Sequence, residues 1–300
     1  MKKRELSPLA DPVFKRVFGE EKEILMELIN AVMELPNPVV NIEYIPPELL
    51  SGNPDKKTTI VDVRCTDDEN RHFIVEMQVA RQKSLKKRVL FNASRVYGRQ
   101  ITSGQDYDVL QPVYALCFSD HTIEPETDRW KHKYVIINED EPWRRIHDVE
   151  MHFIELSKCR KRGNFNLKDP LDRWVKYLID PAFIKALTMD TQYNYPNLKK
   201  AVELLDESNY TEGQLLAYDR YLDSIRTWNS SMKLSYEEGV EEGMEKGMEK
   251  GMEKGIEKGM KNLESVLNDL KAGNPVDEVA ARYELEPAYV EMLYRQFIVK

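Results

Sequence analysis

Apolar and polar residues alternate along two short stretches near residue 70, and this alternation predicts two β-strands. In the first stretch, residues 59–65, Asp62 and Arg64 are expected on one face, because successive side chains of a strand point to opposite faces. The other face of this strand is expected to carry Val61, Val63 and Cys65. The second stretch, residues 73–79, places Glu76 among apolar neighbours. Each predicted strand therefore carries a carboxylate in an otherwise apolar run.

The polar segment between the two strands, residues 67–71, is typical of a hairpin turn. If the hairpin is centred on Glu69, Asp62 and Glu76 lie directly opposite each other, with Cβ atoms roughly 4.5–5.5 Å apart. Two carboxylates in apolar strands cost free energy unless a positive charge lies between them. Because hard oxygen ligands suit Mg²⁺ or Mn²⁺, the pair predicts a site for a divalent cation.

Gln78 shares the predicted face of Glu76, where its side-chain amide can orient a water molecule by hydrogen bonds. The set of Asp62, Glu76 and Gln78 fits a metal-dependent phosphodiesterase, in which the cation polarises the phosphate and lowers the pKa of a bound water. The sequence contains no HExxH pair, no GxxxxGK[ST] loop and no nucleophile elbow. A zinc hydrolase, an NTPase and a serine or cysteine hydrolase are therefore disfavoured.

The first helix is predicted to begin at Asp11, because Asp is a favourable N-cap and the following Pro12 a favourable first helical residue. Apolar residues then recur at helical spacing as far as Val32, and Pro36 ends the pattern. Two interpretations of Asp11 stay open. It is either a helix cap without further function or an acidic residue close to the predicted cation site.

A basic helix is predicted after the hairpin. No acidic residue occurs between Glu76 and Asp106, although the segment is rich in Lys and Arg. Helical spacing aligns one stripe of polar and basic residues, made of Arg88, Asn92, Arg95 and Arg99. Charged runs are usually solvent-exposed faces, but the absence of acidic partners favours contact with a polyanion. The phosphate contacts expected from this region are Arg81, Arg88, Arg95 and Arg99.

Further apolar runs complete a predicted α/β fold. Residues 113–118 are apolar on both faces, as in a central strand, and shorter strands are expected at 40–45, 134–137 and 152–156. From residue 168 onward the apolar spacing is helical, and we interpret these apolar residues as core. Strands therefore dominate the first half of the chain and helices the second.

Glycine recurs at every fourth residue from Gly239 to Gly259, mostly in the repeat GMEK. Small residues at this spacing permit close approach of two helix backbones, but each interior Gly costs roughly 1 kcal/mol relative to Ala. We favour a marginal helix that acts as a spacer or dimerisation arm, with a flexible linker as the alternative. The helical module after it resembles a helix-turn-helix, but its second helix has only Arg295 as a basic residue. The predicted domains are 1–236, 237–261 and 262–300.

Charge and composition narrow the function further. The net charge of −8 argues against nucleic-acid binding by bulk charge, so such binding requires a local patch like the basic helix. No segment has the apolar length of a membrane span or the pattern of a signal peptide. The three cysteines are isolated, which fits a reducing compartment. We therefore expect a cytoplasmic protein without a membrane partner.

These motifs resemble those of known nucleases. An Asp followed by ExQ on adjacent strands is similar to the PD-(D/E)XK nuclease superfamily, whose third motif is ExK or a variant such as ExQ. The blocks DPVFKRVFG, IVDVRC, IVEMQ, RVYGRQ and GQDYDVLQPVYALCF more closely resemble the recombination-promoting nucleases of the Rpn type, also described as transposases. The resemblance extends from residue 7 to about residue 120 and, more loosely, over the rest of the chain.

The resemblance implies a restriction-endonuclease-like α/β core, a central mixed sheet flanked by helices, with a helical C-terminal extension. It also implies metal ligation by Asp62 and Glu76, with Gln78 in the position of the third-motif lysine. Asp11 and Lys15 match the first-helix motif, and Lys15 joins the expected phosphate contacts. Because Gln78 removes a positive charge that could stabilise the attacking hydroxide, we expect slow or conditional activity.

Two functions remain open at this stage. The first is a DNA endonuclease that uses Mg²⁺ or Mn²⁺ on double-stranded DNA, dimeric through its tail, in recombination or transposon-like processes. The alternative is a catalytically weak or inactive, nuclease-derived DNA-binding protein that acts through partner contacts. Both predict a basic face, but only the first predicts that cleavage depends on Asp62 and Glu76.

Overall fold

The structure is a computed structural model that describes residues 4–49, 59–190 and 192–299. The polar residues 51–57, for which the sequence predicts a loop that leads into the hairpin, lie outside the described residues. The chain forms two compact units, Met1–Asn229 and Ser230–Lys300, and each is described here by itself. No helix in the described ranges is long and apolar enough to cross a membrane.

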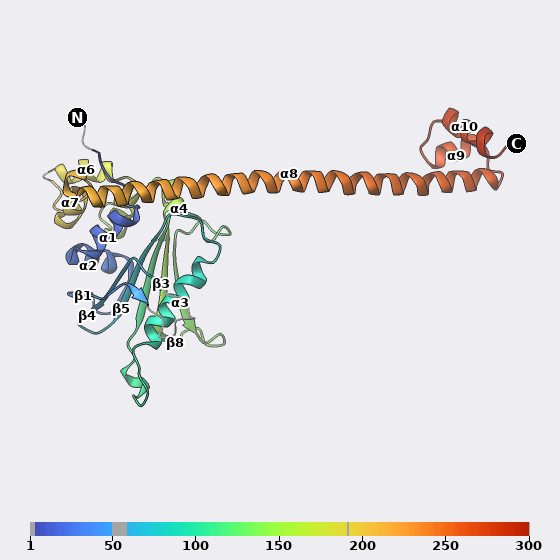
Figure 1. Ribbon diagram of the computed structural model, residues 1–300. Helices are drawn as coiled ribbons and strands as arrows, with labels where there is room; N and C mark the ends of the chain where they lie inside the picture. The colour runs from blue at the N-terminus through green and yellow to red at the C-terminus, as the bar shows by residue number, and fades with distance from the viewer. Residues whose placement is uncertain (1–3, 50–58, 191, 300) are drawn as a thin grey trace. The chain divides into compact units, whose positions relative to one another are not determined.

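A six-stranded mixed sheet forms the centre of the first unit (Figure 1). Its strands are β1 Ile42–Tyr44, β4 Val63–Asp67, β5 His72–Gln78, β6 Val113–Ser119, β7 Lys131–Ile137 and β8 Arg145–Glu155. They lie in the order β1-β4-β5-β6-β8-β7, with β5 and β8 parallel to β6 and the other neighbours antiparallel. The central strand β6 is buried along its whole length, as its two-sided apolar pattern predicted.

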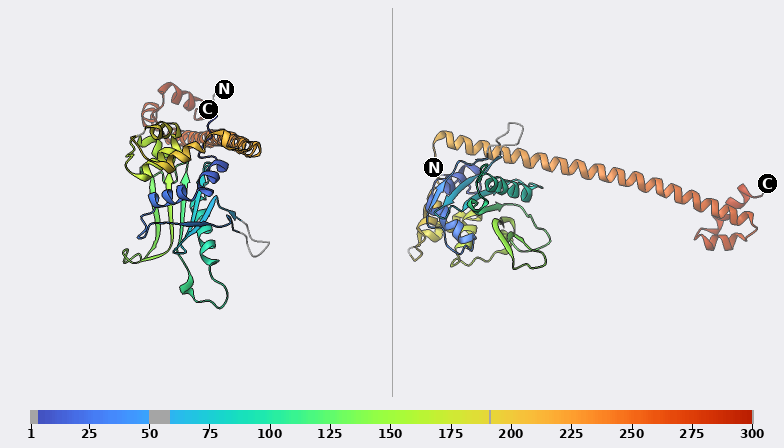
Figure 2. Two further views of the ribbon diagram at one scale, coloured as in Figure 1. Left: turned by 90° about the vertical axis from the view of Figure 1, so that its left-hand side faces the viewer. Right: turned by 90° about the horizontal axis from the view of Figure 1, so that it is seen from below.

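Helices cover both faces of this sheet (Figures 1 and 2). One face carries α3 (Leu85–Gly98), whose apolar side packs against β5, β6 and β8. The opposite face is covered by α1 Asp11–Gly19, α2 Lys22–Val32, α4 Leu156–Arg162, α5 Pro170–Ile179, α6 Pro181–Met189 and α7 Pro196–Glu203. The larger core lies on that second face, where the ring of Phe18 contacts those of Phe14 and Trp174. The mixed sheet and its flanking helices confirm the predicted restriction-endonuclease-like α/β fold.

The single helix predicted from Asp11 to Val32 is two helices. The first ends at Gly19, and Glu20 and Glu21 form the connection before α2. Both helices bury apolar residues in the same core. Helical periodicity alone did not reveal the break, because the apolar spacing continues across it.

The predicted hairpin is confirmed. The strands β4 and β5 are antiparallel neighbours, and Val63 pairs with Val75, which centres the hairpin on Glu69. The paired register ends at Val63, so Asp62 lies one residue before the ladder. A shift of one residue would move each carboxylate to the other face of the sheet, so the burial of one face holds the register.

The first strand of the hairpin is divided in two at Asp62. Before the bend, β3 (Thr59–Ile60) pairs with β2 (Glu48–Leu49) in a separate two-stranded sheet. The bend interrupts the alternation of faces, so Val61 packs on the α3 side of the sheet and Val63 on the opposite side. The prediction that these two valines share a face is therefore wrong.

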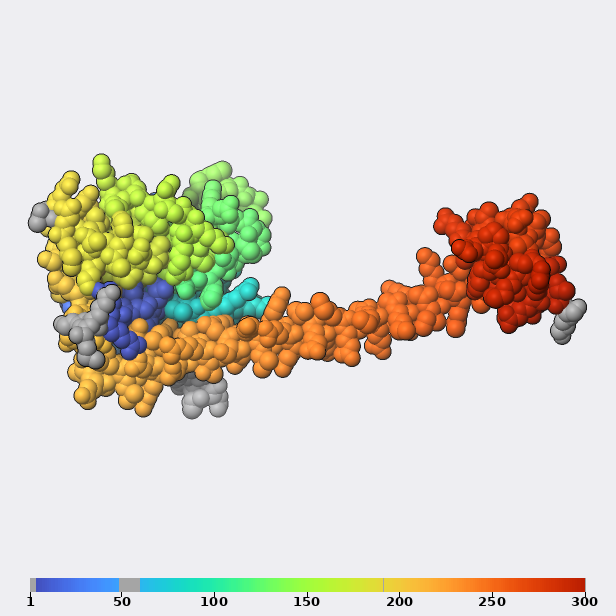
Figure 3. All heavy atoms as spheres, turned by 90° about the horizontal axis from the view of Figure 1, so that it is seen from above, coloured from blue at the N-terminus to red at the C-terminus, as the bar shows by residue number. Residues whose placement is uncertain are grey.

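The long helix α8 (Glu212–Lys271) begins on the first unit. The Tyr218 hydroxyl accepts a hydrogen bond from the Ser7 main-chain amide (3.1 Å), and the Arg16 guanidinium donates to the Gln214 side chain (3.1 Å). In the space-filling view, blue atoms of the N-terminal region lie between yellow-green atoms and the orange atoms of α8 (Figure 3). The first turns of α8 therefore cover part of α1.

The second unit contains the remainder of α8 and two short helices, α9 (Val276–Arg282) and α10 (Pro287–Phe297). The three helices bury a small apolar core that includes Val266, Val279 and Val290. The glycine repeat lies within α8 and is helical. Its first and last glycines are thus part of one continuous helix.

Candidate active site

Acidic side chains gather beside the carboxyl end of β5. Asp62 lies at the bend before β4, Glu76 and Gln78 belong to the end of β5, and Asp11 is the first residue of α1. The charges of Asp11 and Glu76 both act on Asp62. The structure therefore brings together the four residues predicted to be catalytic.

The carboxylate of Asp62 is buried and only partly compensated. One oxygen accepts a hydrogen bond from the Met77 main-chain amide (2.7 Å), and the other lies 3.9 Å from the Lys15 ammonium. The pKa of Asp62 is raised to about 7, mainly by burial and also by the charges of Asp11 and Glu76. The hydrogen bond and Lys15 act in the opposite direction but do not restore the usual pKa.

Glu76 is 3% exposed, yet both of its carboxylate oxygens have partners. One oxygen accepts from the Asn92 side-chain amide (2.9 Å) and the other from the Arg88 guanidinium (2.9 Å). Arg88 also donates to the side-chain oxygen of Gln78 (2.7 Å). The amide nitrogen of Gln78 donates to the carbonyl oxygen of Ala80 (2.7 Å). Arg88 therefore bridges Glu76 and Gln78.

The two carboxylates thus differ in how closely a positive charge approaches them. Arg88 balances Glu76, whereas Asp62 has only the distant ammonium of Lys15. Within residues 4–49, 59–190 and 192–299, no three His, Cys, Asp or Glu side chains are arranged to hold a metal ion. The donor set nevertheless suits a hard cation, because two carboxylates and an amide oxygen come from neighbouring backbone. A cation bound to Glu76 would take the place of Arg88.

Asp11 does not cap its helix. The N-cap of α1 is Ala10, without a side-chain capping hydrogen bond, and Asp11 instead forms an ion pair with Lys15 one turn later (2.8 Å). The interpretation of Asp11 as a simple cap is therefore wrong. Its carboxylate belongs to the acidic group, where it raises the pKa of Asp62.

Sequence reasoning missed Asp120, which directly follows β6. Its main-chain amide donates to the carbonyl oxygen of Gln78 (2.9 Å), and its carboxylate forms an ion pair with Arg160. A signal was present in the sequence, because carboxyl ends of parallel strands meet at one edge of a sheet. The pairing of β6 with β5 therefore carries Asp120 to the edge where Gln78 lies.

Tyr221 of α8 was also missed. Its hydroxyl lies beside the main chain of Asp11, and its pKa is raised to about 12, mainly by burial and further by the charges of Asp11, Asp62 and Asp120. The first part of α8 thus contributes a phenol to the acidic group. No sequence signal marked it, because Tyr221 occupies a position in the helical pattern that reads as core.

The predicted phosphate contacts separate into two groups. Arg88 lies at the acidic group, and Arg81 is exposed after β5, where with Lys83 and His121 it lines a cavity of about 480 Å³. Arg95 and Arg99 lie toward the other end of α3, where the Arg95 guanidinium stacks on the Phe91 ring at 5.5 Å. The helix therefore brings only part of its basic stripe to the acidic group.

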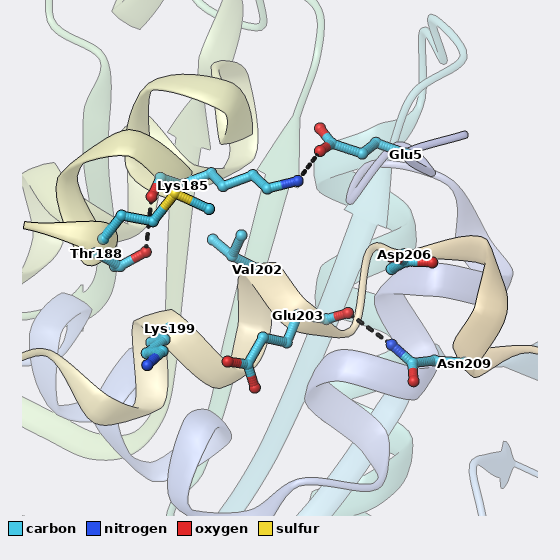
Figure 4. Close-up of a pocket in the computed structure, with 9 residues that line it drawn as sticks. Glu5, Lys185, Thr188, Lys199, Val202, Glu203, Asp206 and Asn209 are labelled. Atoms are coloured by element: carbon cyan, nitrogen blue, oxygen red, sulfur yellow. Dashed lines mark hydrogen bonds and ion pairs between the residues drawn. The ribbon is translucent and has the colours of Figure 1, made fainter. Parts of the chain in front are cut away.

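Another cavity, of about 350 Å³, lies between the N-terminal segment and α6 and α7 (Figure 4). Its lysines include Lys185, which is paired with Glu5, and Lys199. The walls also carry Glu203 and Asp206, so the local charge is mixed. None of the predicted catalytic residues lines this cavity, and we assign it no part in the chemistry.

The fold and the acidic group define the class of the protein, a nuclease-like α/β fold with carboxylates at the edge of a mixed sheet. A family model described as PD-(D/E)XK nuclease family transposase matches residues 8–235. The chain therefore belongs to that family, and the suspected resemblance is confirmed. PD-(D/E)XK nucleases generally use divalent metals and act on DNA. Searches of curated proteins and of solved structures found no match.

Proposed function

We propose that this protein is a DNA endonuclease that depends on a divalent metal, Mg²⁺ or Mn²⁺. The observation that carries the proposal is the gathering of the Asp62, Glu76 and Asp11 carboxylates, in which the Lys15 ammonium lies 3.9 Å from Asp62, because carboxylates with so little compensation suit a bound cation. Asp62 and Glu76 would hold the metal. When bound, the metal supplies Lewis-acid polarisation of the phosphate and a water of lowered pKa.

The residues around the carboxylates have separate tasks in this proposal. Arg88 moves from Glu76 to the substrate phosphate, since a guanidinium can bind phosphate as well as carboxylate. That movement frees the oxygen of Gln78 to accept a hydrogen bond from water. Asp11 holds Lys15 beside Asp62, so that this ammonium faces the phosphate backbone.

Basic residues beside the acidic group would hold double-stranded DNA. The cavity of about 480 Å³ is lined by Arg81, Lys83, Lys86 and His121, and by no acidic residue. The buried carboxylate of Glu155 accepts hydrogen bonds from the main-chain amides of Ile123 (2.8 Å) and Glu124 (3.3 Å), which fixes one wall. Contacts of this kind give affinity and position without base specificity.

Plasmid nicking tests the proposed activity. Wild-type protein should nick DNA with Mg²⁺ or Mn²⁺ and lose activity in EDTA. Asp62→Ala and Glu76→Ala should each lower the rate by roughly a thousandfold, about 4 kcal/mol in activation free energy. Asp128→Ala, at an exposed position outside the acidic group, is the matched control and should cleave like wild type. Cleavage in EDTA, or cleavage that survives both substitutions, contradicts the proposal.

One observation favours the second candidate, a DNA-binding protein without turnover. Glu76 has both oxygens satisfied by Arg88 and Asn92, so it is stable without a metal. If that arrangement is permanent, no cation reaches Glu76 and the protein binds DNA without cutting it. In that case EDTA, Asp62→Ala and Glu76→Ala leave DNA binding unchanged and wild type shows no nicking.

A homodimer through the glycine repeat is part of the proposal, as is a cytoplasmic location. A Cβ added at any glycine from Gly239 to Gly259 would meet no described atom within 4 Å, so the fold of one chain does not require these glycines. Methionines of the same segment are 67–76% exposed: Met244, Met248, Met252 and Met260. Deletion of residues 237–300 should convert a dimer to a monomer, which light scattering measures, and an unchanged dimer contradicts the role of the repeat as a dimerisation arm.

The cytoplasmic location is supported by the three cysteines, which are free and buried, as suits a reducing compartment.

A further inference from the structure

A second group of cationic side chains lies at the other end of α3. Arg99 at the C-cap of α3, Arg64 of β4 and His72 of β5 line one cavity of about 330 Å³, called here the distal cavity. The remaining lining residues are neutral: Asn70, Val96, Gln100, Val109 and Gln111. Among the described residues that line it, the distal cavity therefore has two arginines and no acidic side chain.

Polar atoms inside this region lack partners. Among the described residues, Arg64 Nε and His72 Nδ1 are buried and have no hydrogen-bond partner. Burial lowers the pKa of Arg64, and Arg99 lowers it further; burial and Arg64 likewise lower the pKa of His72. The carboxylate of Asp67 partly offsets the lowering at His72, but it is itself bound to the Arg71 guanidinium (2.6 Å). Buried donors without acceptors normally indicate an absent partner.

The wall of the distal cavity is held in place by two reciprocal hydrogen bonds. The Gln100 side chain donates to the carbonyl oxygen of Gln111 (2.9 Å) and accepts from the Gln111 main-chain amide (2.7 Å). These bonds tie the end of α3 to the segment that enters β6. Arg99 is therefore displayed from a fixed backbone, which lowers the cost of ordering it around a ligand.

We propose that the distal cavity binds a phosphodiester group of the DNA backbone, remote from the phosphate that is cut. The proposal rests on the proposed function in taking DNA as the substrate. Arg88 and Arg99 are eleven residues apart on α3, a separation of roughly 16 Å at 1.5 Å per residue.

DNA binding at several salt concentrations tests the proposal without cleavage. Fluorescence anisotropy in EDTA should compare wild type with Arg99→Gln and with Arg64→Gln/Arg99→Gln. Loss of one phosphate contact should lower the slope of log K against log salt by about 0.9 and weaken binding roughly tenfold at low salt. Arg99 is exposed, so the single variant should fold even if Arg64→Gln does not. Lys87→Gln, an exposed position of α3 outside the cavity, is the control with the same charge change and should lower the slope much less.

The outcomes separate this proposal from the nuclease assignment. Phosphate binding in the distal cavity would be contradicted if the salt slopes were equal for Arg99→Gln, the double variant and Lys87→Gln, whatever the nicking assay shows. Absence of DNA binding by wild type would overturn it as well. Inorganic phosphate that shifts the Arg64 Nε–H resonance, together with unchanged DNA affinity in the variants, would assign the cavity to a free anion instead. A lowered salt slope in the Arg99 variants, together with no nicking by wild type, would support phosphate binding in the distal cavity and contradict the proposed endonuclease activity.

Discussion

The two ends of α3 face the same sheet but differ in the charges that they meet. Near its first turn, Arg88 lies against the buried carboxylate of Glu76. At its last residue, Arg99 meets Arg64 and His72, with no acidic lining residue. Arg88 is thus compensated by a carboxylate, whereas Arg99 lies beside no acidic residue among the described residues that line its cavity. The residues of β4 and β5 that face α3 determine this difference. They pair Arg88 within the protein and leave Arg99 available to a ligand.

A similar contrast holds between the two opposed carboxylates. Glu76 has a guanidinium and an amide as partners, whereas Asp62 has one main-chain amide and an ammonium at 3.9 Å. The Asp62 side chain is 19% exposed and that of Glu76 4%, so the less compensated carboxylate is also the more exposed one. We expect Glu76 to stabilise the metal-free fold together with its partners and Asp62 to destabilise it.

The largest predicted effect is on stability without metal. Asp62 has a pKa of about 7 in the fold, against an ordinary value of 3.8, so its ionisation costs stability as the pH rises between these values. The cost is absent below pH 3.8 and complete above about pH 7, where it is at most about 4 kcal/mol. Asp62→Asn should therefore raise the melting temperature in EDTA at pH 8 and much less at pH 4.

The control for this measurement is Asp128→Asn, the same chemical change at an exposed position. It should leave the melting temperature nearly unchanged at both pH values. A stabilisation by Asp62→Asn that is equal at pH 4 and pH 8 would show that ionisation of Asp62 is not its cause.

The next effect is stabilisation by metal. A cation that binds only the folded protein at a hundred times its dissociation constant adds about 2.7 kcal/mol of stability. Mg²⁺ should thus raise the melting temperature of wild type at pH 8, where Asp62 is ionised, and have little effect on Asp62→Asn. Equal stabilisation of both proteins would place the cation elsewhere in the molecule.

Removal of the amide partner of Glu76 should cost less. Asn92→Leu leaves one oxygen of a buried carboxylate without a donor, at a cost of about 2 kcal/mol in unfolding free energy. Urea unfolding measures the change, and Ser94→Leu at an exposed position of α3 is the control for helix propensity. In the Glu76→Gln background the cost of Asn92→Leu should shrink, since the unpaired oxygen is then uncharged. A cost that is the same in both backgrounds would indicate loss of packing only.

The smallest predicted effect concerns turnover. Gln78→Lys places an ammonium beside the predicted metal and should raise the nicking rate about tenfold, or about 1.4 kcal/mol. Repulsion between this ammonium and Arg88 should also release Arg88 from the strand, which favours its contact with phosphate. Gln78→Met, of similar size but without charge, should not accelerate nicking. A slower rate in Gln78→Lys would contradict the view that glutamine limits turnover.

Local patterns of the sequence determined the hairpin, its register and the two-sided burial of β6. Alternation with period two identifies a strand, and the polar turn at 67–71 specifies which residues lie opposite each other. Asp62, Glu76 and Gln78 could therefore be chosen without a structure. The same patterns failed at Asp62 and at Glu20, where the backbone changes direction without a change in apolar spacing.

Only the tertiary structure decided which charges meet. The contact of Arg88 with Glu76 depends on how α3 docks on the sheet, and the approach of Asp120 to Gln78 depends on the parallel pairing of β5 and β6. Tyr221 reaches Asp11 from more than two hundred residues away along the chain. Periodicity reports which face of an element is buried, but not its partner across the core. The sequence therefore predicted the carboxylates themselves. It did not predict the partners that compensate them or the arginines that meet in the distal cavity.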